Sequence, residues 1–429
     1  MGGRCAGASL AIQLARSGAS VCVVDRARFP SDVLSTHGIQ PSGVLALNRL
    51  GVREQVEATT VPIVRAEIAL GAASGAVDEV TELLGAPMLN VRRCTLDQIL
   101  LDAAAAAGAD VRPETNVREL IRDGDRITGI RTSAGDIEAA IVVGADGSRS
   151  TVARLVDAEE YAVTAPPRLF VWGYFDGVAI DGAATVWVGK PDAHGFLASP
   201  TDAGLFMAAA TFDMARKADV LVDREQAFRT ALREWPELEA VVAGGTLQGP
   251  LRAMANWRGF FRRSAGPGWA LVGDAGHFKD PTPGQGIADA FRQSERLASA
   301  ILDGLGGRVP IDEALTRWWH WRDADAWEMY WFAHDIGAAG RTAPLTREVQ
   351  ESIVRSPRMR QRLIRVLNHE VSPAAVATTG LVAGAFARSL ARSRADRRRI
   401  LTEARDIVRD ELSRRRARPR ASRGRVGRG

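Results

Sequence analysis

Cysteine is scarce in this sequence, with only 3 in 429 residues. Cys5, Cys22 and Cys94 are too few, and odd in number, for a disulfide scaffold, and their separations match no metal-binding motif. We therefore expect reduced thiols, no metal site and a cytoplasmic location.

Long apolar runs are also missing, because no stretch approaches the roughly 20 apolar residues that a membrane-spanning helix needs. With 46% hydrophobic and 25% charged residues, the composition is that of a soluble globular protein. The length allows two or three domains, each with its own core.

Lysine is rare as well, since Lys190, Lys217 and Lys279 are the only three. The basic charge comes from arginine, and eight arginines lie between Arg414 and Arg428, where there is no acidic residue. Leaving these eight out changes the formal net charge from +5 to −3. We therefore predict a disordered basic tail over residues 411–429 and no nucleic-acid partner. A nucleic-acid-binding protein that uses this tail is the non-enzymatic alternative.

Among the features that are present, the most informative is residues 273–286, Gly-Asp-Ala-Gly-His-Phe-Lys-Asp-Pro-Thr-Pro-Gly-Gln-Gly. A short apolar run, residues 269–272, precedes it and predicts a buried strand. From Ile287 to Leu302, apolar residues recur at intervals of three and four, which predicts a helix. The first N–H groups of a helix have no partner within it and carry partial positive charge, so this corner suits an electron-rich or anionic group.

This stretch resembles the flavin-binding G-D-x-x-H-x-x-x-P-x-x-G-x-G segment of FAD-dependent monooxygenases of the para-hydroxybenzoate hydroxylase type. Geranylgeranyl reductases and flavin halogenases share that superfamily. The resemblance implies that Asp274 binds the ribityl chain of FAD and that the backbone from Gly284 to Gly286 faces the pyrimidine end of the isoalloxazine. Gly273 and Pro281 are the other motif residues expected at the cofactor.

A glycine-rich turn, Gly2-Gly3-Arg4-Cys5-Ala6-Gly7, runs into a predicted amphipathic helix, and a strand over residues 21–24 then ends at Asp25. This order is typical of half of a βαβ dinucleotide-binding fold, with a pyrophosphate near the helix start and an acidic residue on the adenosine ribose. We expect Gly2, Gly7, Asp25 and Arg26 to contact the cofactor. Arg4 replaces the middle glycine, and its guanidinium is expected to lie against phosphate.

The first strand of a βαβ unit should precede the first glycine, yet only Met1 does so. That strand is normally central and buried in the parallel sheet. We therefore expect that the chain begins inside its motif and that about six or more upstream residues, rich in Val and Ile, belong to the native protein. Produced from Met1, the protein is expected to hold little FAD.

Two further segments resemble motifs of the same family. Residues 91–100 resemble its R-x-x-L helix start, which implies that Arg93 reaches the ribityl chain or a phosphate. Residues 141–153 resemble its Asp-Gly motif, which implies that Asp146 and Gly147 approach the pyrophosphate and the entry path of the nicotinamide. His37, in the polar connection after Asp25, is a candidate cofactor contact or an ordinary capping residue.

Together these features predict an α/β fold, in which a Rossmann-like FAD-binding domain carries an inserted antiparallel β-sheet substrate domain and a helical C-terminus. The FAD-binding domain is expected over residues 1–60, 91–155 and 256–310, the substrate domain over 61–90 and 156–255, and the C-terminal helices over 311–410. Within the substrate domain, residues 61–70 and 77–89 are predicted strands.

Several aromatic residues remain open to two interpretations. Trp172, Tyr174 and Phe196 are candidate walls of a substrate pocket or plain core residues. The aromatic cluster between Trp318 and Phe332 either closes that pocket or anchors a C-terminal helix.

The resemblance implies an FAD-dependent monooxygenase that uses NAD(P)H and oxygen to hydroxylate or epoxidise an aromatic, polycyclic or prenylated small molecule. Such a protein positions the substrate, stabilises charge on the flavin and excludes water, so no catalytic side chain is assigned. Tyr174, His194 and His277 are the only candidates for one. The alternative is a reductase of the geranylgeranyl type, and a halogenase is less favoured because no W-x-W-x-I-P segment occurs.

Overall fold

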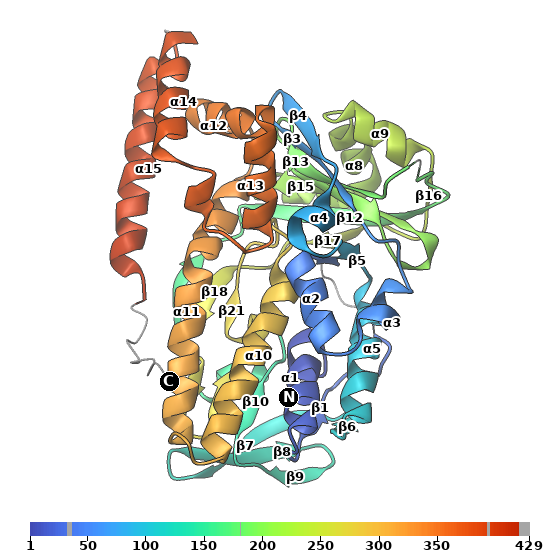
Figure 1. The fold of residues 1–429 in the computed structure, drawn as a ribbon, viewed down its shortest axis with the longest axis vertical. Helices are drawn as coiled ribbons and strands as arrows, with labels where there is room; N and C mark the ends of the chain where they lie inside the picture. Colours follow the sequence, from blue (N-terminus) through green and yellow to red (C-terminus); the bar gives the residue numbers. More distant parts are fainter. Residues whose placement is uncertain (32–36, 181, 393–394, 420–429) are drawn as a thin grey trace.

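The computed structural model of the chain describes residues 1–31, 37–180, 182–392 and 395–419. Figure 1 shows a lower part built of long, nearly parallel helices over short strands, and an upper part built around a large sheet. At one edge, helices α14 (Thr379–Arg392) and α15 (Arg397–Ala417) form a hairpin that projects from the rest of the molecule.

The lower part contains the segments of the predicted FAD-binding domain, and we call it the nucleotide-binding half. Its central helices, α1 (Cys5–Arg16) and α10 (Gly286–Leu305), pack against each other because α1 buries an almost continuous apolar face and α10 presents apolar residues three and four apart. The other elements around this core are α2 (Pro41–Arg49), α3 (Arg53–Glu57), α5 (Arg93–Ala106), α6 (Thr151–Leu155), β2 (Gly38–Ile39), and the hairpin strands β7 (Val117–Asp123), β8 (Arg126–Thr132) and β9 (Gly135–Glu138).

The parallel strands of this half form two separate sheets. In one, β1 (Cys22–Val24) pairs with β6 (Asp110–Arg112), and in the other β10 (Val142–Gly144) pairs with β20 (Trp269–Leu271), which continues to β19 (Ala265–Gly266). Met1 and Gly2 lie between them, since the Gly2 amide donates to Val24 O at 2.8 Å and the Met1 amine donates to Val143 O at 2.8 Å.

The upper sheet has the strand order β16-β12-β15-β14-β13-β3-β4, and β17 also pairs with β12. Its strands are β3 (Arg65–Leu70), β4 (Ala73–Val77), β12 (Arg168–Asp176), β13 (Thr185–Lys190), β14 (Phe196–Pro200), β15 (Phe206–Asp213), β16 (Thr246–Leu247) and β17 (Arg252–Met254). The sheet is mixed and not purely antiparallel as predicted, because β13 pairs with β3 in parallel.

The two faces of this sheet have different cores, since side chains alternate along each strand. One face buries Val171, Phe175 and Phe196 against helices α7 (Lys217–Val222), α8 (Arg224–Leu232) and α9 (Pro236–Ala243). The other face carries Phe170, Trp172 and Tyr174 and is turned toward the nucleotide-binding half. β11 (Glu160–Thr164), β18 (Gly259–Arg262) and β21 (His277–Phe278) form a small separate sheet.

The predicted strand over residues 77–89 is wrong. β4 ends at Val77, and the apolar residues that follow form a short helix, α4 (Val80–Leu84), before β5 (Leu89–Asn90). Val80 and Leu84 are four residues apart and are both buried, so the run has helical and not alternating spacing. Gly85, with φ of 77°, ends this helix in the left-handed region.

The C-terminal part consists of helices α11 (Ile311–Ile336), α12 (Pro344–Arg355), α13 (Pro357–Leu367), α14 (Thr379–Arg392) and α15 (Arg397–Ala417). The aromatic residues of α11 anchor it to its neighbours, because Trp318 lies in the main core while Trp327 and Tyr330 pack on Phe261. The aromatic cluster therefore serves packing, in accordance with the second of the two interpretations.

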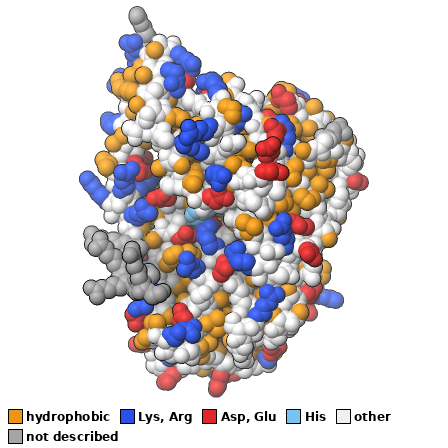
Figure 2. Space-filling model, viewed as in Figure 1, with side chains coloured by type: hydrophobic (Ala, Val, Ile, Leu, Met, Phe, Trp, Pro, Cys, Tyr) orange, Lys and Arg blue, Asp and Glu red, His pale blue; other side chains and the backbone are white. Residues whose placement is uncertain are grey.

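The basic tail begins later than predicted, because residues 411–417 are the last turns of α15. The Arg414 guanidinium pairs with Asp335 at 2.6 Å, and the Trp327 indole donates to Arg414 O, so this end of the helix is tied to α11. Residues 420–429 of the predicted tail lie outside the described residues. Figure 2 shows numerous basic side chains over the projecting hairpin. No helix of the described chain combines the length and the apolar character required to cross a bilayer.

Candidate functional site

A cavity of about 710 Å³ runs from the start of α1, past the loop after β10, to the start of α10. Of the predicted cofactor-binding residues, all except Gly7 and Gly284 line it. They are Gly2, Arg4, Asp25, Arg26, Arg93, Asp146, Gly147, Gly273, Asp274, Pro281 and Gly286. The cavity is within the range of about 300–1,000 Å³ that is usual for ligand and cofactor sites.

Gly7 has a packing role. A β-carbon at this position would lie 1.8 Å from Gly2 O, so only glycine allows α1 to approach the N-terminal turn this closely. Gly284, with φ of +63°, lines a second and smaller cavity on the other side of the motif loop. Each therefore shapes the site without lining the large cavity.

At one end of the large cavity, Asp25 holds the glycine-rich turn in place. Its Oδ2 accepts from the Gly3 amide at 2.8 Å, and its Oδ1 accepts from the Ala27 amide at 2.8 Å. Each carboxylate oxygen keeps a second lone pair, so the side chain can still accept from a ligand hydroxyl.

Asp97 fixes two arginines in the cavity wall, and the sequence analysis did not single it out. Its fully buried carboxylate accepts from Arg4 Nη1 at 3.0 Å and from Arg93 Nη2 at 2.8 Å. Arg4 also donates to Ser31 Oγ at 2.8 Å, so its guanidinium is held at the wall by two partners. Burial alone would lower the pKa of Arg93, but Asp97 more than offsets it, so Arg93 stays charged.

Asp146 serves the N-terminal end of α6. Its carboxylate accepts from Ser150 Oγ at 2.5 Å and from the Thr151 amide at 2.6 Å. These bonds satisfy donors that have no partner within the helix, and they shape the Gly147 turn at the cavity.

Asp274 has no hydrogen-bond partner in the described part of the chain. The side chain is exposed and opens into the large cavity, where the surrounding protein partly desolvates the carboxylate. This desolvation raises the pKa of the carboxyl to about 6, although the Arg93 charge opposes the shift. A ligand hydroxyl in the cavity would donate a hydrogen bond to this acceptor, which has no partner among the described residues.

The first turn of α10 is open to the same cavity. A side chain at Gly286 would meet no atom within 4 Å, so the unpaired amides of this helix start are accessible.

The smaller cavity, of about 40 Å³, lies between the upper sheet and α13. It shares Gly38 with the large cavity and includes Pro283 and Gly284 of the motif. Its apolar walls are Ile63, Met88, Leu89, Val186, Val188, Leu197, Met207, Ile364 and Leu367. Gln40, Asn90, Ser199 and Thr282 are its polar lining residues.

The three candidate wall residues are core residues. Trp172 and Tyr174 belong to an aromatic cluster on the inner face of the sheet, and neither lines either cavity. Phe196 is on the opposite face, edge-on to Trp235, which accords with the core interpretation.

The histidines differ in their surroundings. His37 is buried, and its Nε2 contacts the Tyr174 hydroxyl. His194 pairs with Glu234 at 2.8 Å, away from both cavities. His277 lines the large cavity, and its pKa is well below the usual value because of burial and the nearby Arg322, so the ring is neutral.

The sequence analysis also missed Lys279, Asp289 and Trp257, which all line the large cavity. A signal existed for Lys279, which is one of only three lysines and lies inside the motif. Trp257 comes from the segment between β17 and β18, where no local pattern points to a ligand.

The family described as FAD binding domain matches residues 1–330. The chain belongs to this family. It is an FAD-dependent oxidoreductase, and the large cavity fits FAD, because it offers acceptors for hydroxyl groups at Asp25 and Asp274 and open amides at the start of α10.

Related proteins catalyse different reactions. A tryptophan 2-halogenase of Chondromyces crocatus is 26% identical over 73% of this chain and 62% of its own length. A menaquinone reductase of Mycolicibacterium smegmatis is 27% identical over 70% of this chain and 75% of its own. A digeranylgeranylglycerophospholipid reductase of Methanothrix thermoacetophila is 27% identical over 54% and 60%. The chain thus spans less than two thirds of the first and third of these relatives.

Solved structures share the fold. The flavin-dependent brominase Bmp2 superposes with a TM-score of 0.71 at 18% identity, covering 91% of this chain and 98% of Bmp2. PqsL of Pseudomonas aeruginosa, a probable FAD-dependent monooxygenase, gives a TM-score of 0.65 at 20% identity, covering 85% and 97%.

We expect FAD affinity to fall as the pH is lowered through about 6. A ribityl hydroxyl donates a stronger hydrogen bond to the ionised than to the protonated carboxyl of Asp274, whose free-site pKa is about 6, so binding at pH 5 should be up to about tenfold weaker than at pH 7.5. Asp274→Asn keeps an acceptor at every pH and should show no such loss. Asp274→Ala should weaken FAD by about 1.5–3 kcal/mol. Fluorescence titration with FAD checks this, and equal wild-type affinity at both pH values contradicts it.

We also expect Asp25→Ala to weaken FAD binding more than FMN binding, because FMN lacks the adenosine ribose. The structure adds a second effect, since the variant also loses the bonds to Gly3 and Ala27. Calorimetric titration with both flavins separates the two. An equal loss for FAD and FMN would show that Asp25 acts only as an anchor of the turn.

Proposed function

We propose that this protein is a monooxygenase that uses NAD(P)H and oxygen to hydroxylate or epoxidise an apolar small molecule. The small cavity carries the proposal. It is mainly apolar, it touches the motif residues Pro283 and Gly284, and it shares Gly38 with the FAD cavity. A substrate held there would lie directly against the flavin site.

The reaction balances with one equivalent of each reactant: NAD(P)H, H⁺, O₂ and the substrate give NAD(P)⁺, water and the hydroxylated product or epoxide. Bound FAD supplies the transfer of electrons from the nicotinamide to oxygen. The chain itself provides binding, orientation and a dry pocket. Asp25 and Asp274 would hold hydroxyl groups of FAD, and the start of α10 would face its most electron-rich part.

The size of the small cavity narrows the substrate. About 40 Å³ is well below the roughly 150 Å³ that accommodates benzene in an engineered cavity. A single ring or the end of a prenyl chain could enter if Met88 and Met207, which are flexible side chains, moved aside. A polycyclic substrate would require displacement of backbone and fits less well.

A reductase without oxygen chemistry is the second candidate, and the menaquinone and digeranylgeranylglycerophospholipid reductases among the relatives favour it. The tryptophan 2-halogenase among the relatives favours a third candidate, a halogenase. The small cavity directly contacts the motif loop. This arrangement suits a reaction in which the substrate reacts at the flavin itself, as it does in both a monooxygenase and a reductase.

We expect the FAD-loaded protein to consume O₂ and NAD(P)H in equal amounts when a phenol, indole or prenylated compound from a panel is converted. Val186→Phe should fill the small cavity and abolish this substrate-dependent uptake while FAD content stays unchanged. Val163→Phe, at an exposed position of β11, is the matched control. Product formed without oxygen would indicate a reductase, and uptake that requires chloride or bromide would indicate a halogenase.

A further inference from the structure

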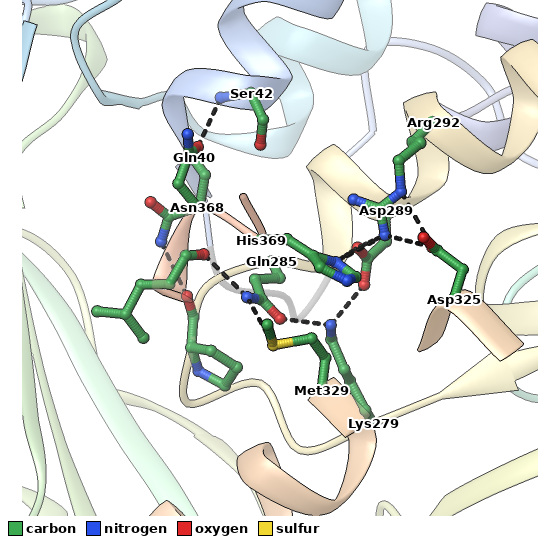
Figure 3. A network of polar contacts seen from close by, with 12 residues as sticks. Gln40, Ser42, Lys279, Gln285, Asp289, Arg292, Asp325, Met329, Asn368 and His369 are labelled. Carbon is green, nitrogen blue, oxygen red and sulfur yellow. Dashed lines mark hydrogen bonds and ion pairs between the residues drawn. The ribbon is translucent and has the colours of Figure 1, made fainter. Parts of the chain in front are cut away.

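Lys279 is buried in the motif loop and pairs with two residues of the helix start. Figure 3 shows its ammonium between Gln285 and Asp289. Lys279 Nζ lies 2.6 Å from Asp289 Oδ2 and 2.5 Å from Gln285 Oε1. The side chains of Lys279 and Asp289 are only 5% and 7% exposed, so solvent screens their charges weakly.

A second cation completes the cluster. Arg292 Nη2 lies 2.9 Å from Asp289 Oδ1 and 2.8 Å from Asp325 Oδ2. It also lies 2.7 Å from His369 Nδ1 (Figure 3). The same His369 Nδ1 lies 3.5 Å from Asp289 Oδ1, so the imidazole lies beside both the arginine and the carboxylate. Besides this histidine, the cluster holds two cations and two carboxylates.

The charge state of Asp289 follows from these contacts. Burial alone would raise the pKa of its carboxyl, but Lys279 and Arg292 hold that pKa well below its usual range. Burial lowers the pKa of Lys279, and the ionised Asp289 opposes that change. We take both groups as charged, because a separation of 2.6 Å is that of a charge-assisted hydrogen bond.

The cluster borders the large cavity that would hold FAD. Lys279 and Asp289 both line the large cavity, beside Gly286 at the start of α10. Reduction places negative charge on a flavin, and a nearby carboxylate without a compensating cation would oppose it. Lys279 is one of two cations that pair with Asp289, the other being Arg292, and Lys279 belongs to the motif loop itself.

We propose that Lys279 keeps the charge beside the bound FAD balanced and thereby raises its reduction potential. The proposal requires FAD binding, which the family membership supports, and it does not depend on the monooxygenase reaction. Lys279 is a positioning and tuning residue, since its effect on the flavin acts through the balance with Asp289.

A purely structural role for Lys279 is the competing explanation. Gln285, which Lys279 contacts, donates through Nε2 to Val366 O at 3.1 Å and to Leu367 O at 2.9 Å. Loss of Lys279 could therefore loosen the attachment of the motif loop to α13. A charge effect and a packing effect can be separated by removing the carboxylate along with the lysine.

The test compares Lys279→Met, Lys279→Arg and the double variant Lys279→Met with Asp289→Asn, all loaded with FAD. Lys279→Met should bind reduced flavin about tenfold less well relative to oxidised flavin, which for two electrons is a fall of about 30 mV in midpoint potential. Sulfite adds reversibly to oxidised flavin and makes it negative, so its Kd should rise at least tenfold. Lys279→Arg should retain the wild-type values.

The double variant is decisive. It removes the carboxylate together with the lysine and so restores neutrality. Its sulfite Kd, and its ratio of affinities for reduced and oxidised flavin, should therefore both return to within about threefold of the wild-type values. Arg308→Met, which removes the cation of an exposed pair with Asp303, is the control for net charge and should change neither quantity.

Two outcomes would overturn the proposal. One is a Lys279→Met protein with full FAD content and unchanged potential. The other is a loss of FAD or a shifted potential that Asp289→Asn does not correct, which would assign Lys279 to the packing of the loop. Neither outcome bears on whether oxygen is the electron acceptor, so the proposed reaction would be judged separately by O₂ uptake.

Discussion

The start of helix α10 has backbone amides without partners in the helix, and both cavities are arranged around it. The large cavity reaches it at Gly286, and the small cavity reaches the preceding loop at Pro283 and Gly284. The helix itself is fixed on several sides, because its apolar face packs on α1 and it also contacts α11 and α2. A displacement of α10 would therefore alter the cofactor site and the adjoining pocket together.

Buried charge pairs set the position of the loop before α10. Arg168, on β12 of the upper sheet, pairs with Asp280 of the loop at 2.6 Å, and both side chains are less than 5% exposed. Such a pair adds little net stability, because desolvation of both charges offsets their attraction, but its geometry permits few alternatives. Together with Gln285 on the other side of the loop, it fixes the distance between the sheet and the flavin motif.

Local patterns predicted eleven of the residues that line the large cavity, because glycine, proline and acidic residues at strand ends have constrained backbone roles whatever the rest of the chain does. Phe196 could not be placed in this way, since the face to which a strand residue points depends on the pairing register with distant strands. Residues 80–84 were wrongly predicted as part of a strand, because a short apolar run is compatible with either a strand or a buried turn of helix. Asp97 and Asp289 were missed for a different reason, because their importance arises from arginine and lysine partners that only the folded chain brings near.

The small cavity is lined partly by residues that lie beyond the end of the family match, and this bears on how related proteins diverge. The match ends at residue 330, whereas Ile364 and Leu367 of α13 form one wall of the small cavity. Gln285 and Asn368 tie this end of α13 to the motif loop and to the first turn of α2, because Asn368 Oδ1 accepts from the Ser42 amide at 2.7 Å. A segment outside the shared domain thus closes the pocket that adjoins the shared cofactor site. Substitutions in α13 can reshape that pocket without altering the residues that line the FAD cavity, which is a physical route by which one scaffold can serve halogenases, reductases and monooxygenases.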